Sequence, residues 1–537
     1  MIDQSPASVT QMPGVSGSVT NFSGAETLNT VQGRHEHVLN TEHLLVNLKG
    51  RTVSSGFVAV AAQGAQFALT LGSTMVLARI LAPHDFGLIT MVMTIFGFLR
   101  VFKDAGLSTA TVQREAITHA QVSNLFWVNV ALSGIISLIV AVSAPAIAWF
   151  YGEPKLLDIT LLLSISFLFE GAAVQHMAIL NRQMRFKMLA LIQISSLLTA
   201  VTVGIAMAIA KLGYWSLVGF QLATPLTTLI LAWTVSGWRP QLPARRSGTR
   251  PLLSFGAHFT ASTFMWSLAR GADTLLIGRM FGLASVGLYS RGAALLMRPL
   301  EQFITPIHTV FVPAFSRLQD YPEQFRRAFL RLYHAIALAS LFFAALLLAL
   351  SRPLTLLVLG AKWEKAAPIF AAFTVAALIY PVSSAAGWLF TSQGRGKDWL
   401  KAISLASIAT VSSFLVGLPF GPVGVALAFS ASGIFLQLPI IFHIGGQSGP
   451  VRTRDLWIGF LRQLPVWIGV CGVTSAVLTA MHGSSFVAQL GVSAAVGLAS
   501  GAAIIWFYPP ARAVVTDLLD ALKEWDKFRK AAPPISS

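Results

Sequence analysis

Charged side chains occur inside long apolar stretches of this sequence, where they are costly unless they face a protein interior or a water-filled cavity. Four arginines and two acids fall between residues 270 and 301, so this segment carries an excess of positive charge. Guanidinium groups bind phosphate oxygens in a planar, bidentate geometry. The sequence therefore predicts a cationic cavity for an anionic ligand, above all a phosphate or diphosphate, formed by Arg270, Arg279, Arg291 and Arg298.

Three acidic residues in the apolar segments have two possible roles. A carboxylate inside a membrane protein can exchange a proton or bind Na⁺, and so couple transport to an ion gradient. Alternatively, two of the three can form ion pairs, because each lies three residues after an arginine on a helix, in the pairs Arg270–Asp273 and Arg298–Glu301. The third acid, Glu170, is isolated in its segment, where it could instead form a hydrogen bond with a neighbouring polar side chain and take no part in ion coupling. The candidates for ion coupling are Glu170, Asp273 and Glu301.

A polar stripe follows the first apolar segment. Its members recur every three or four residues, so they share one helix face. Their amide and hydroxyl groups could bind sugar hydroxyls, or they could form hydrogen bonds between helices. The stripe is thus a candidate polar wall of the same cavity, made of Gln63, Gln66, Thr70, Ser73 and Thr74.

A helical membrane bundle is needed to position these side chains. Of the 537 residues, 55% are hydrophobic and only 11% are charged, and the mean hydropathy is +0.68. A soluble domain carries about 25% charged residues. One pass through the bilayer takes about 20 apolar residues, and about fourteen apolar segments can be counted between residues 54 and 508. The segments are continuous rather than alternating, which predicts an all-α polytopic protein instead of a barrel.

The distribution of positive charge predicts the orientation of the chain. The net charge of +17 would suggest nucleic acid in a soluble protein, but here the basic residues lie between apolar segments. If the N-terminus is cytoplasmic, twenty Lys and Arg residues lie in cytoplasmic loops and six lie in or beside outer loops. This alternation predicts that both termini lie in the cytoplasm.

The sequence lacks the motifs of common enzymes and metal sites. It contains no GxSxG, GxxxxGK[ST] or HExxH motif, and its single cysteine, Cys471, excludes CxxC zinc clusters and intrachain disulfides. We therefore predict that the protein is not an enzyme and that it binds no cofactor or metal.

An internal repeat divides the chain. STMVLARILAPHDFGL, from Ser73, aligns with DTLLIGRMFGLASVGL, from Asp273, at an offset of 200 residues, and the two copies share an Arg and a Gly. Six helices separate the copies, so the repeats are parallel and an axis along the membrane normal relates them. The shared glycines are expected to allow a tight turn or a close approach of helices.

The predicted division has six parts: a disordered cytoplasmic tail (1–50), an N-terminal six-helix bundle (51–240), a basic cytoplasmic linker (241–252), a C-terminal six-helix bundle (253–445), two additional transmembrane helices (455–508) and a cytoplasmic amphipathic tail (509–537).

Two sequence blocks resemble a known family. LARILAPHDFGL with the following KDAGLSTATVQ is similar to the first block of Wzx-type polysaccharide flippases. ADTLLIGRMFGLASVGLYSRGAALLMRPLEQFITPIHTVFVPAFSRLQ resembles the second block of the colanic-acid-exporter branch. The resemblance covers about residues 50–445 and places the chain in the multidrug/oligosaccharidyl-lipid/polysaccharide exporter superfamily.

The resemblance implies two six-helix bundles around a V-shaped cavity, followed by two further helices. It also implies a multi-pass transporter in the lipid bilayer of the bacterial inner membrane, which flips undecaprenyl-diphosphate-linked oligosaccharides from the cytoplasmic to the periplasmic leaflet by alternating access. Such a protein would serve exopolysaccharide or lipopolysaccharide biosynthesis, with a polysaccharide polymerase or export machinery as possible partners. The alternative is a cation-coupled drug or metabolite antiporter of the same superfamily, which would require an acidic cavity that the arginine excess opposes.

Overall fold

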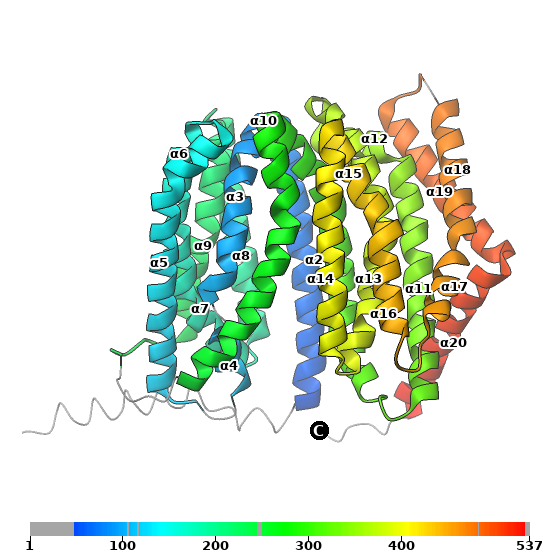
Figure 1. Cartoon of the computed structure of the whole chain (residues 1–537), viewed down its shortest axis with the longest axis horizontal. Coiled ribbons are helices and arrows are strands. Elements are labelled where there is room, and N and C mark those ends of the chain that lie inside the picture. The colour runs from blue at the N-terminus through cyan, green and yellow to red at the C-terminus, as the bar shows by residue number, and fades with distance from the viewer. Residues whose placement is uncertain (1–47, 105–106, 115–116, 244–249, 482, 532–537) are drawn as a thin grey trace, which may run out of the picture.

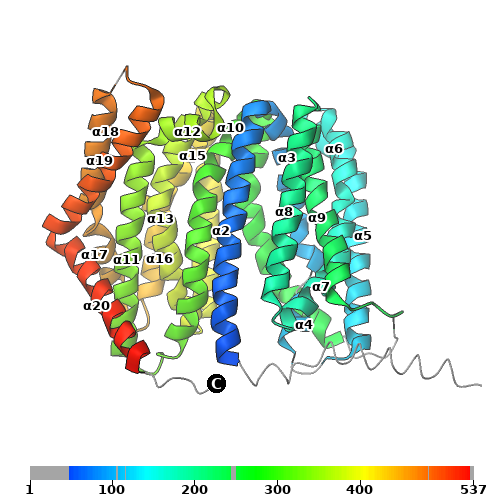
Figure 2. The ribbon, with the colours of Figure 1, turned by 180° about the vertical axis from the view of Figure 1, so that it is seen from behind.

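Apolar helices make up most of the computed structural model of this chain, which describes residues 48–104, 107–114, 117–243, 250–481 and 483–531. No β-strand occurs within these ranges. The helices run side by side in one bundle (Figures 1 and 2). The first half of the bundle contains α2 (Leu48–Ile80), α3 (Pro83–Asp104), α4 (Leu107–Gln113), α5 (His119–Tyr151), α6 (Lys155–Ser164), α7 (Ser166–Arg182), α8 (Phe186–Ile209) and α9 (Trp215–Ser236).

The second half repeats this order. It contains α10 (Arg250–Ser316), α11 (Pro322–Ala349), α12 (Ser351–Leu359), the 3-10 turn η2 (Ala361–Ala366), α13 (Ala367–Ser392), α14 (Gly396–Gly417), the 3-10 turn η3 (Leu418–Phe420), α15 (Gly421–Ser432), the π-helical turn η4 (Gly433–Gln437) and α16 (Leu438–Gly446). The chain then continues through α17 (Thr453–Leu461), α18 (Leu464–Ala480), α19 (Phe486–Phe507) and α20 (Pro509–Ala531).

The predicted passes agree with these helices. Eleven segments of the described chain are long and apolar enough to cross a membrane. Two of them contain a break, since Gly282 interrupts α10 with φ 75° and ψ −173°, and η3 separates α14 from α15. A positive φ of this size favours glycine, so Gly282 permits the turn within α10. With these two segments divided and α3 included, the fourteen predicted passes are present, which confirms the polytopic helical fold.

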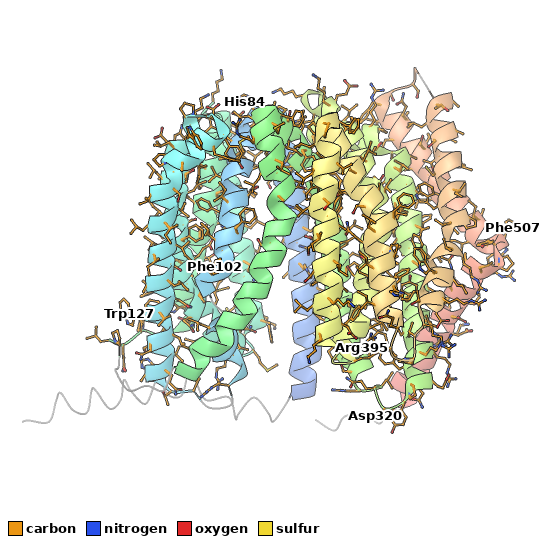
Figure 3. The ribbon with its side chains drawn as sticks, in the orientation of Figure 1. His84, Phe102, Trp127, Asp320, Arg395 and Phe507 are labelled. Carbon is orange, nitrogen blue, oxygen red and sulfur yellow. The ribbon has the colours of Figure 1, made fainter. Side chains whose placement is uncertain are left out.

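The two ends of the bundle can be named by labelled residues. Figure 3 places His84 at one end, and Trp127, Asp320 and Arg395 at the other. We call these the His84 end and the Arg395 end. The α2–α3 turn lies at the His84 end, whereas α2 begins at the Arg395 end (Figure 1).

The internal repeat appears as a reciprocal contact between the halves. A Cβ atom on Gly87 would lie 2.0 Å from the carbonyl oxygen of Leu283, and one on Gly287 would lie 1.9 Å from that of Pro83. These are equivalent contacts, because 200 residues separate both Pro83 from Leu283 and Gly87 from Gly287. Between them, the hydroxyls of Thr90 and Ser290 form a 3.2 Å hydrogen bond. The contact is therefore two-fold symmetric, and the prediction that the glycines allow a close approach is confirmed.

A second repeat, at an offset of 210 residues, was not recognised in the sequence. QMRFK (183–187) spans the start of α8 and QGRGK (393–397) spans the start of α14. Arg185 and Arg395 have nearly the same backbone conformation, with φ and ψ of −81° and 54° and of −83° and 52°. Arg185 donates a hydrogen bond to the carbonyl of Val235 at the end of α9, at 3.2 Å.

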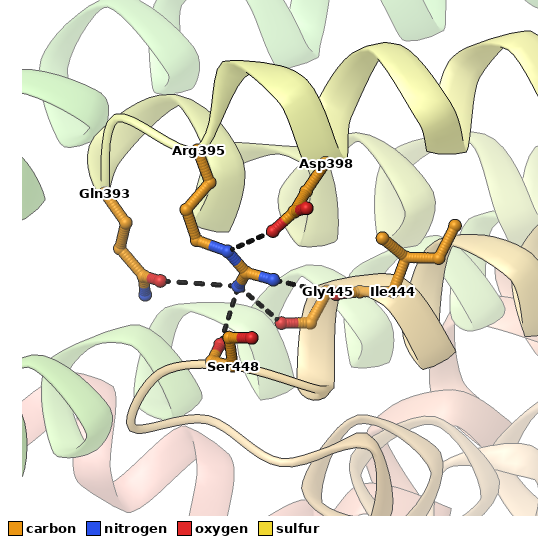
Figure 4. Close-up of polar contacts among 6 residues, drawn as sticks. All are labelled: Gln393, Arg395, Asp398, Ile444, Gly445 and Ser448. Atoms are coloured by element: carbon orange, nitrogen blue, oxygen red, sulfur yellow. Dashed lines mark hydrogen bonds and ion pairs between the residues drawn. The ribbon is translucent and has the colours of Figure 1, made fainter.

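Arg395 makes the equivalent contact more extensively (Figure 4). Its guanidinium donates to the carbonyls of Ile444 and Gly445, both at 2.8 Å, and to that of Ser448 at 2.6 Å, while Asp398 accepts from its Nε at 2.9 Å. The last carbonyls of α16 have no partner within the helix, so the arginine stabilises this helix end.

The halves also meet beside η2. Arg79 at the end of α2 donates to the carbonyl of Leu357 at 3.0 Å, and the indole of Trp363 donates to the carbonyl of Ala78 at 2.8 Å. Lys362 donates to two further α2 carbonyls, those of Arg79 and Ile80, both at 3.2 Å. Direct hydrogen bonds therefore join α2 to α12 and η2 at the His84 end.

The predicted terminal segments differ in how much of each is described. Most of the 1–50 tail lies outside the described residues, and α2 already begins at Leu48. The linker 241–252 is described only at its two ends. The amphipathic tail is the helix α20, whose Ala511 and Val514 are buried in a cluster with α11 and α18. Leu518 and Leu519 on the same helix are exposed.

Candidate functional site

A cavity of about 440 Å³ lies between α2 and the second part of α10. We call it the central cavity. Residues three, four and seven apart on α2 point into it, because these spacings return to one helix face. The cavity brings together six of the residues predicted from the sequence: Gln63, Thr70 and Thr74 from α2, and Arg291, Arg298 and Glu301 from α10.

Arg291 is held in place by an aromatic ring. Its guanidinium carbon lies 5.0 Å from the centroid of Phe86, in the geometry of a cation–π contact. Its Nε atom is buried and has no hydrogen-bond partner among the described residues. Phe86 in turn packs edge-on against Trp363 of η2, with ring centroids 5.2 Å apart. The cation is thus fixed beside the contact between the halves.

Arg298 lies seven residues further along α10, about two helical turns away on the same face. Its side chain is exposed and lines the central cavity, and the partly buried side chain of Glu301 lines the same cavity. Pro299 also lines this wall, and it lacks the backbone N–H that would bond within the helix. The wall therefore carries two guanidinium groups and one carboxylate.

A second cavity, of about 580 Å³, opens on the other side of Arg298 and Glu301. We call it the C-terminal cavity, because α10, α13, α14, α15 and α16 line it. Asp273 lies in its wall, where it accepts hydrogen bonds from the Tyr289 hydroxyl at 2.9 Å and from the Thr274 backbone N–H at 2.5 Å. Arg298 and Glu301 thus face both cavities.

A third cavity, of about 800 Å³, lies within the first half of the bundle and is called the N-terminal cavity. Glu170 lines it, but this acid is not isolated as the sequence suggested. Its carboxylate forms an ion pair with Arg100 at 2.7 Å. The physical reason is the length of α3, which continues to Asp104 and so carries Arg100 within the helix.

The remaining predicted residues lie outside the central cavity. Gln66 donates to the side chain of Gln193 on α8 at 3.0 Å, and buried Ser73 donates to the carbonyl of Thr70 at 2.9 Å. These two polar groups therefore bond within the protein. Arg279 is exposed and lines none of the three cavities. Arg270 lies on α10, but its side chain is outside the described residues.

Phe86 and Arg100 are the site residues that sequence reasoning missed. Arg100 carried a signal, since a basic residue near the end of an apolar helix can reach inward as well as outward. Phe86 carried none, because its role depends on the contact between the halves. Among the described residues, no group of three or more His, Cys, Asp or Glu side chains could hold a metal ion.

A family model described as "Polysaccharide biosynthesis protein" matches residues 76–368, which is more than half of the chain. The chain belongs to this family. The matched range includes Phe86, Arg100, Glu170 and the cavity-lining residues of α10, and it begins just after the polar face of α2. Membership of the polysaccharide biosynthesis protein family confirms the resemblance seen in the two sequence blocks.

Individual relatives agree with the family assignment. The chain is 25% identical over 432 residues to the lipopolysaccharide biosynthesis protein WzxC of Escherichia coli (strain K12), covering 79% of this chain and 87% of that protein. It is 28% identical over 361 residues to the teichuronic acid biosynthesis protein TuaB of Bacillus subtilis (strain 168), covering 66% and 72%.

A solved structure has the same fold. The lipid II flippase MurJ, in an inward closed conformation, superposes with a TM-score of 0.66 at 15% identity, over 84% of this chain and 99% of that chain. At this identity the likeness shows the fold alone. The chain is therefore a multi-pass membrane protein with the architecture expected from its repeats.

Proposed function

We propose that this protein is a transporter that flips undecaprenyl-diphosphate-linked oligosaccharide repeat units from the cytoplasmic to the periplasmic leaflet, without changing them covalently. It would act by alternating access in exopolysaccharide or lipopolysaccharide biosynthesis. The observation that carries the proposal is the central cavity, where Arg291 and Arg298 line the space between the two halves. Its membership of the polysaccharide biosynthesis protein family, and its similarity to a lipopolysaccharide and a teichuronic acid biosynthesis protein, support the same conclusion.

The diphosphate is the part of such a substrate that most needs the protein. Its negative charges are costly to move through hydrocarbon, and guanidinium groups offer charge-assisted hydrogen bonds in their place. We assign this role to Arg291 and Arg298. Arg270 remains a proposed contributor, whereas Arg279 is exposed and lines none of the three cavities, so we do not assign it this role.

Hydroxyl and amide groups on α2 would contact the sugars. We assign this role to Gln63, Thr70 and Thr74, which share the central cavity with the arginines. Gln66 and Ser73 would contribute only if transport breaks their present hydrogen bonds.

The proposed orientation places the Arg395 end in the cytoplasm and the His84 end in the periplasm of a bacterial inner membrane. The excess of Lys and Arg in alternate loops supports it. A polysaccharide polymerase or export machinery would then receive the product at the His84 end. An alkaline phosphatase fusion after Ser537 should be inactive, and an active fusion would reverse the orientation.

Ion coupling is proposed for three acids. Glu170 in the N-terminal cavity is paired with Arg100, while Asp273 and Glu301 line the C-terminal cavity. A carboxylate whose partner changes during transport can bind or release a cation in each cycle. Flipping driven by an imposed proton or Na⁺ gradient should lose that dependence when the coupling acid is replaced by its amide.

The test of function is reconstitution into proteoliposomes. A fluorescent polyprenyl-diphosphate oligosaccharide should become accessible on both leaflets only when the protein is present. The same vesicles should not exchange a cationic drug for protons. Drug exchange without flipping, over several glycans and imposed gradients, would favour the antiporter of the same superfamily instead.

A further inference from the structure

The N-terminal and C-terminal cavities occupy equivalent places in the two halves of the chain. Five pairs of residues line the two cavities, with one member of each pair in each cavity. The members of every pair are 210 residues apart, the same offset that relates QMRFK to QGRGK. The equivalent pairs are Glu170 and Tyr380, Ala173 and Ser383, Val174 and Ser384, Leu189 and Trp399, and Gln193 and Ile403. The fold thus forms the same cavity twice, with different linings.

Aromatic rings distinguish the C-terminal cavity from its counterpart. Tyr380 replaces the acid of the Arg100–Glu170 pair, and Trp399 replaces Leu189. Trp399 is partly buried and remains in the cavity wall, where its indole lies against α13. A Cβ atom on Gly387 would lie 3.2 Å from that ring. The equivalent position in the first half is Met177, so a Trp–Gly pair replaces a Leu–Met pair.

Polar groups surround these rings. The wall also contains the hydroxyls of Ser383, Ser384, Ser407 and Thr410, the amide of Gln437 and the carboxylates of Asp273 and Glu301. A flat apolar ring bordered by hydroxyls, an amide and carboxylates matches the chemistry of a sugar, which presents C–H groups on its faces and hydroxyls around its edge.

The wall between the central and C-terminal cavities determines which sugar of the substrate can bind in the C-terminal cavity. Arg298 and Glu301 line both the central and the C-terminal cavity. A diphosphate on Arg298 therefore places its directly attached sugar at the opening of the C-terminal cavity. We propose that this cavity is a subsite for the sugar linked to the diphosphate, and that Trp399 is the residue that stacks on it. The inference rests on the proposed function and identifies the part of the substrate that the C-terminal half selects.

Binding to the full-length protein in detergent tests this subsite. The probes are farnesyl diphosphate and its derivatives carrying glucose, galactose or N-acetylglucosamine, followed by microscale thermophoresis. The wild type should bind at least one glycosylated probe about tenfold more tightly than farnesyl diphosphate, as expected for one aromatic stacking contact. Trp399→Leu should lose this preference while retaining its affinity for farnesyl diphosphate.

Two further variants keep the result interpretable. The double variant Gly387→Met/Trp399→Leu introduces the pair found at the equivalent positions of the first half, which restores side-chain volume without the indole. It should behave like Trp399→Leu if stacking is the cause. Trp149→Leu changes a tryptophan on α5 that is 83% exposed and lies outside the three cavities, and it should retain the wild-type preference.

The possible failures are distinguishable. Equal affinity of the wild type for bare and glycosylated probes, or a preference that survives in both Trp399 variants, would overturn the subsite and leave the proposed function standing. Equal weakening of every probe in the Trp399 variants would mean that the cavity holds the lipid or the diphosphate instead. No binding of farnesyl diphosphate, or binding that Arg291→Ala/Arg298→Ala does not affect, would overturn the proposed function as well.

Discussion

The reciprocal glycine contact makes a quantitative prediction. In Gly87→Ala the new methyl group would lie 2.0 Å from the carbonyl oxygen of Leu283, and backbone at that distance cannot move aside without separating α3 from α10. Overpacking of this kind costs about 1–3 kcal/mol. Alanine is also a better helix former than glycine by about 1 kcal/mol, so the net loss for Gly87→Ala is smaller than the overlap energy.

A control on the same helix isolates the overlap. A Cβ atom on Gly97 of α3 would meet nothing within 4 Å, so Gly97→Ala gains the helix propensity without a clash. The difference between the two variants should therefore be about 1–3 kcal/mol in the free energy of unfolding. Gly287→Ala should match Gly87→Ala, and the double variant should be less than additive, because both alter one contact.

The assay is unfolding of the purified protein by SDS in mixed micelles, followed by tryptophan fluorescence, with the midpoint of thermal unfolding as a second measurement. Gly87→Ala should unfold at lower SDS and lower temperature than Gly97→Ala. Equal stability of the two variants would refute the view that the halves meet through these glycines.

Two further predictions concern polar contacts. Arg100→Gln should remove the 2.7 Å ion pair with the Glu170 carboxylate and lower the free energy of unfolding by about 1–3 kcal/mol. The double variant Arg100→Gln/Glu170→Gln should recover part of this loss. Purely additive effects of the two substitutions would show that the pair contributes no coupling energy. Arg395→Lys should lose the paired guanidinium hydrogen bonds to the last carbonyls of α16 and lower the free energy of unfolding by about 1–3 kcal/mol. The loss should exceed that of Arg185→Lys, which removes a single described hydrogen bond to α9. Equal midpoints of thermal unfolding for the two variants would contradict this ranking.

The helical passes and the 200-residue repeat could be predicted because each depends on local sequence. Apolar length determines where a chain can cross a bilayer, and shared glycines mark a close approach wherever the fold places it. The residues of the central cavity could also be predicted in part, because Arg291 and Arg298 are charges in apolar sequence and Thr70 and Thr74 belong to one helix face.

Partners across the fold could not be predicted in the same way. Gln66 and Gln63 have the same chemistry, yet one bonds Gln193 and the other lines the central cavity, and only the rotation of α2 against α8 decides between them. Glu170 looked isolated because Arg100 is 70 positions away in the sequence. The equivalence of the N-terminal and C-terminal cavities could not be predicted from the 200-residue repeat, because the residues that line them are related by an offset of 210 residues.

The most direct test of the central claim is flipping of a fluorescent polyprenyl-diphosphate oligosaccharide in proteoliposomes by the wild type, by Arg291→Ala/Arg298→Ala and by Arg279→Ala. Arg279 is the matched control, since it is an arginine of the same helix that lies outside the cavities. We expect the double variant to incorporate normally and to lose flipping, while Arg279→Ala flips like the wild type. Normal flipping by Arg291→Ala/Arg298→Ala would contradict the assignment of the diphosphate to the central cavity.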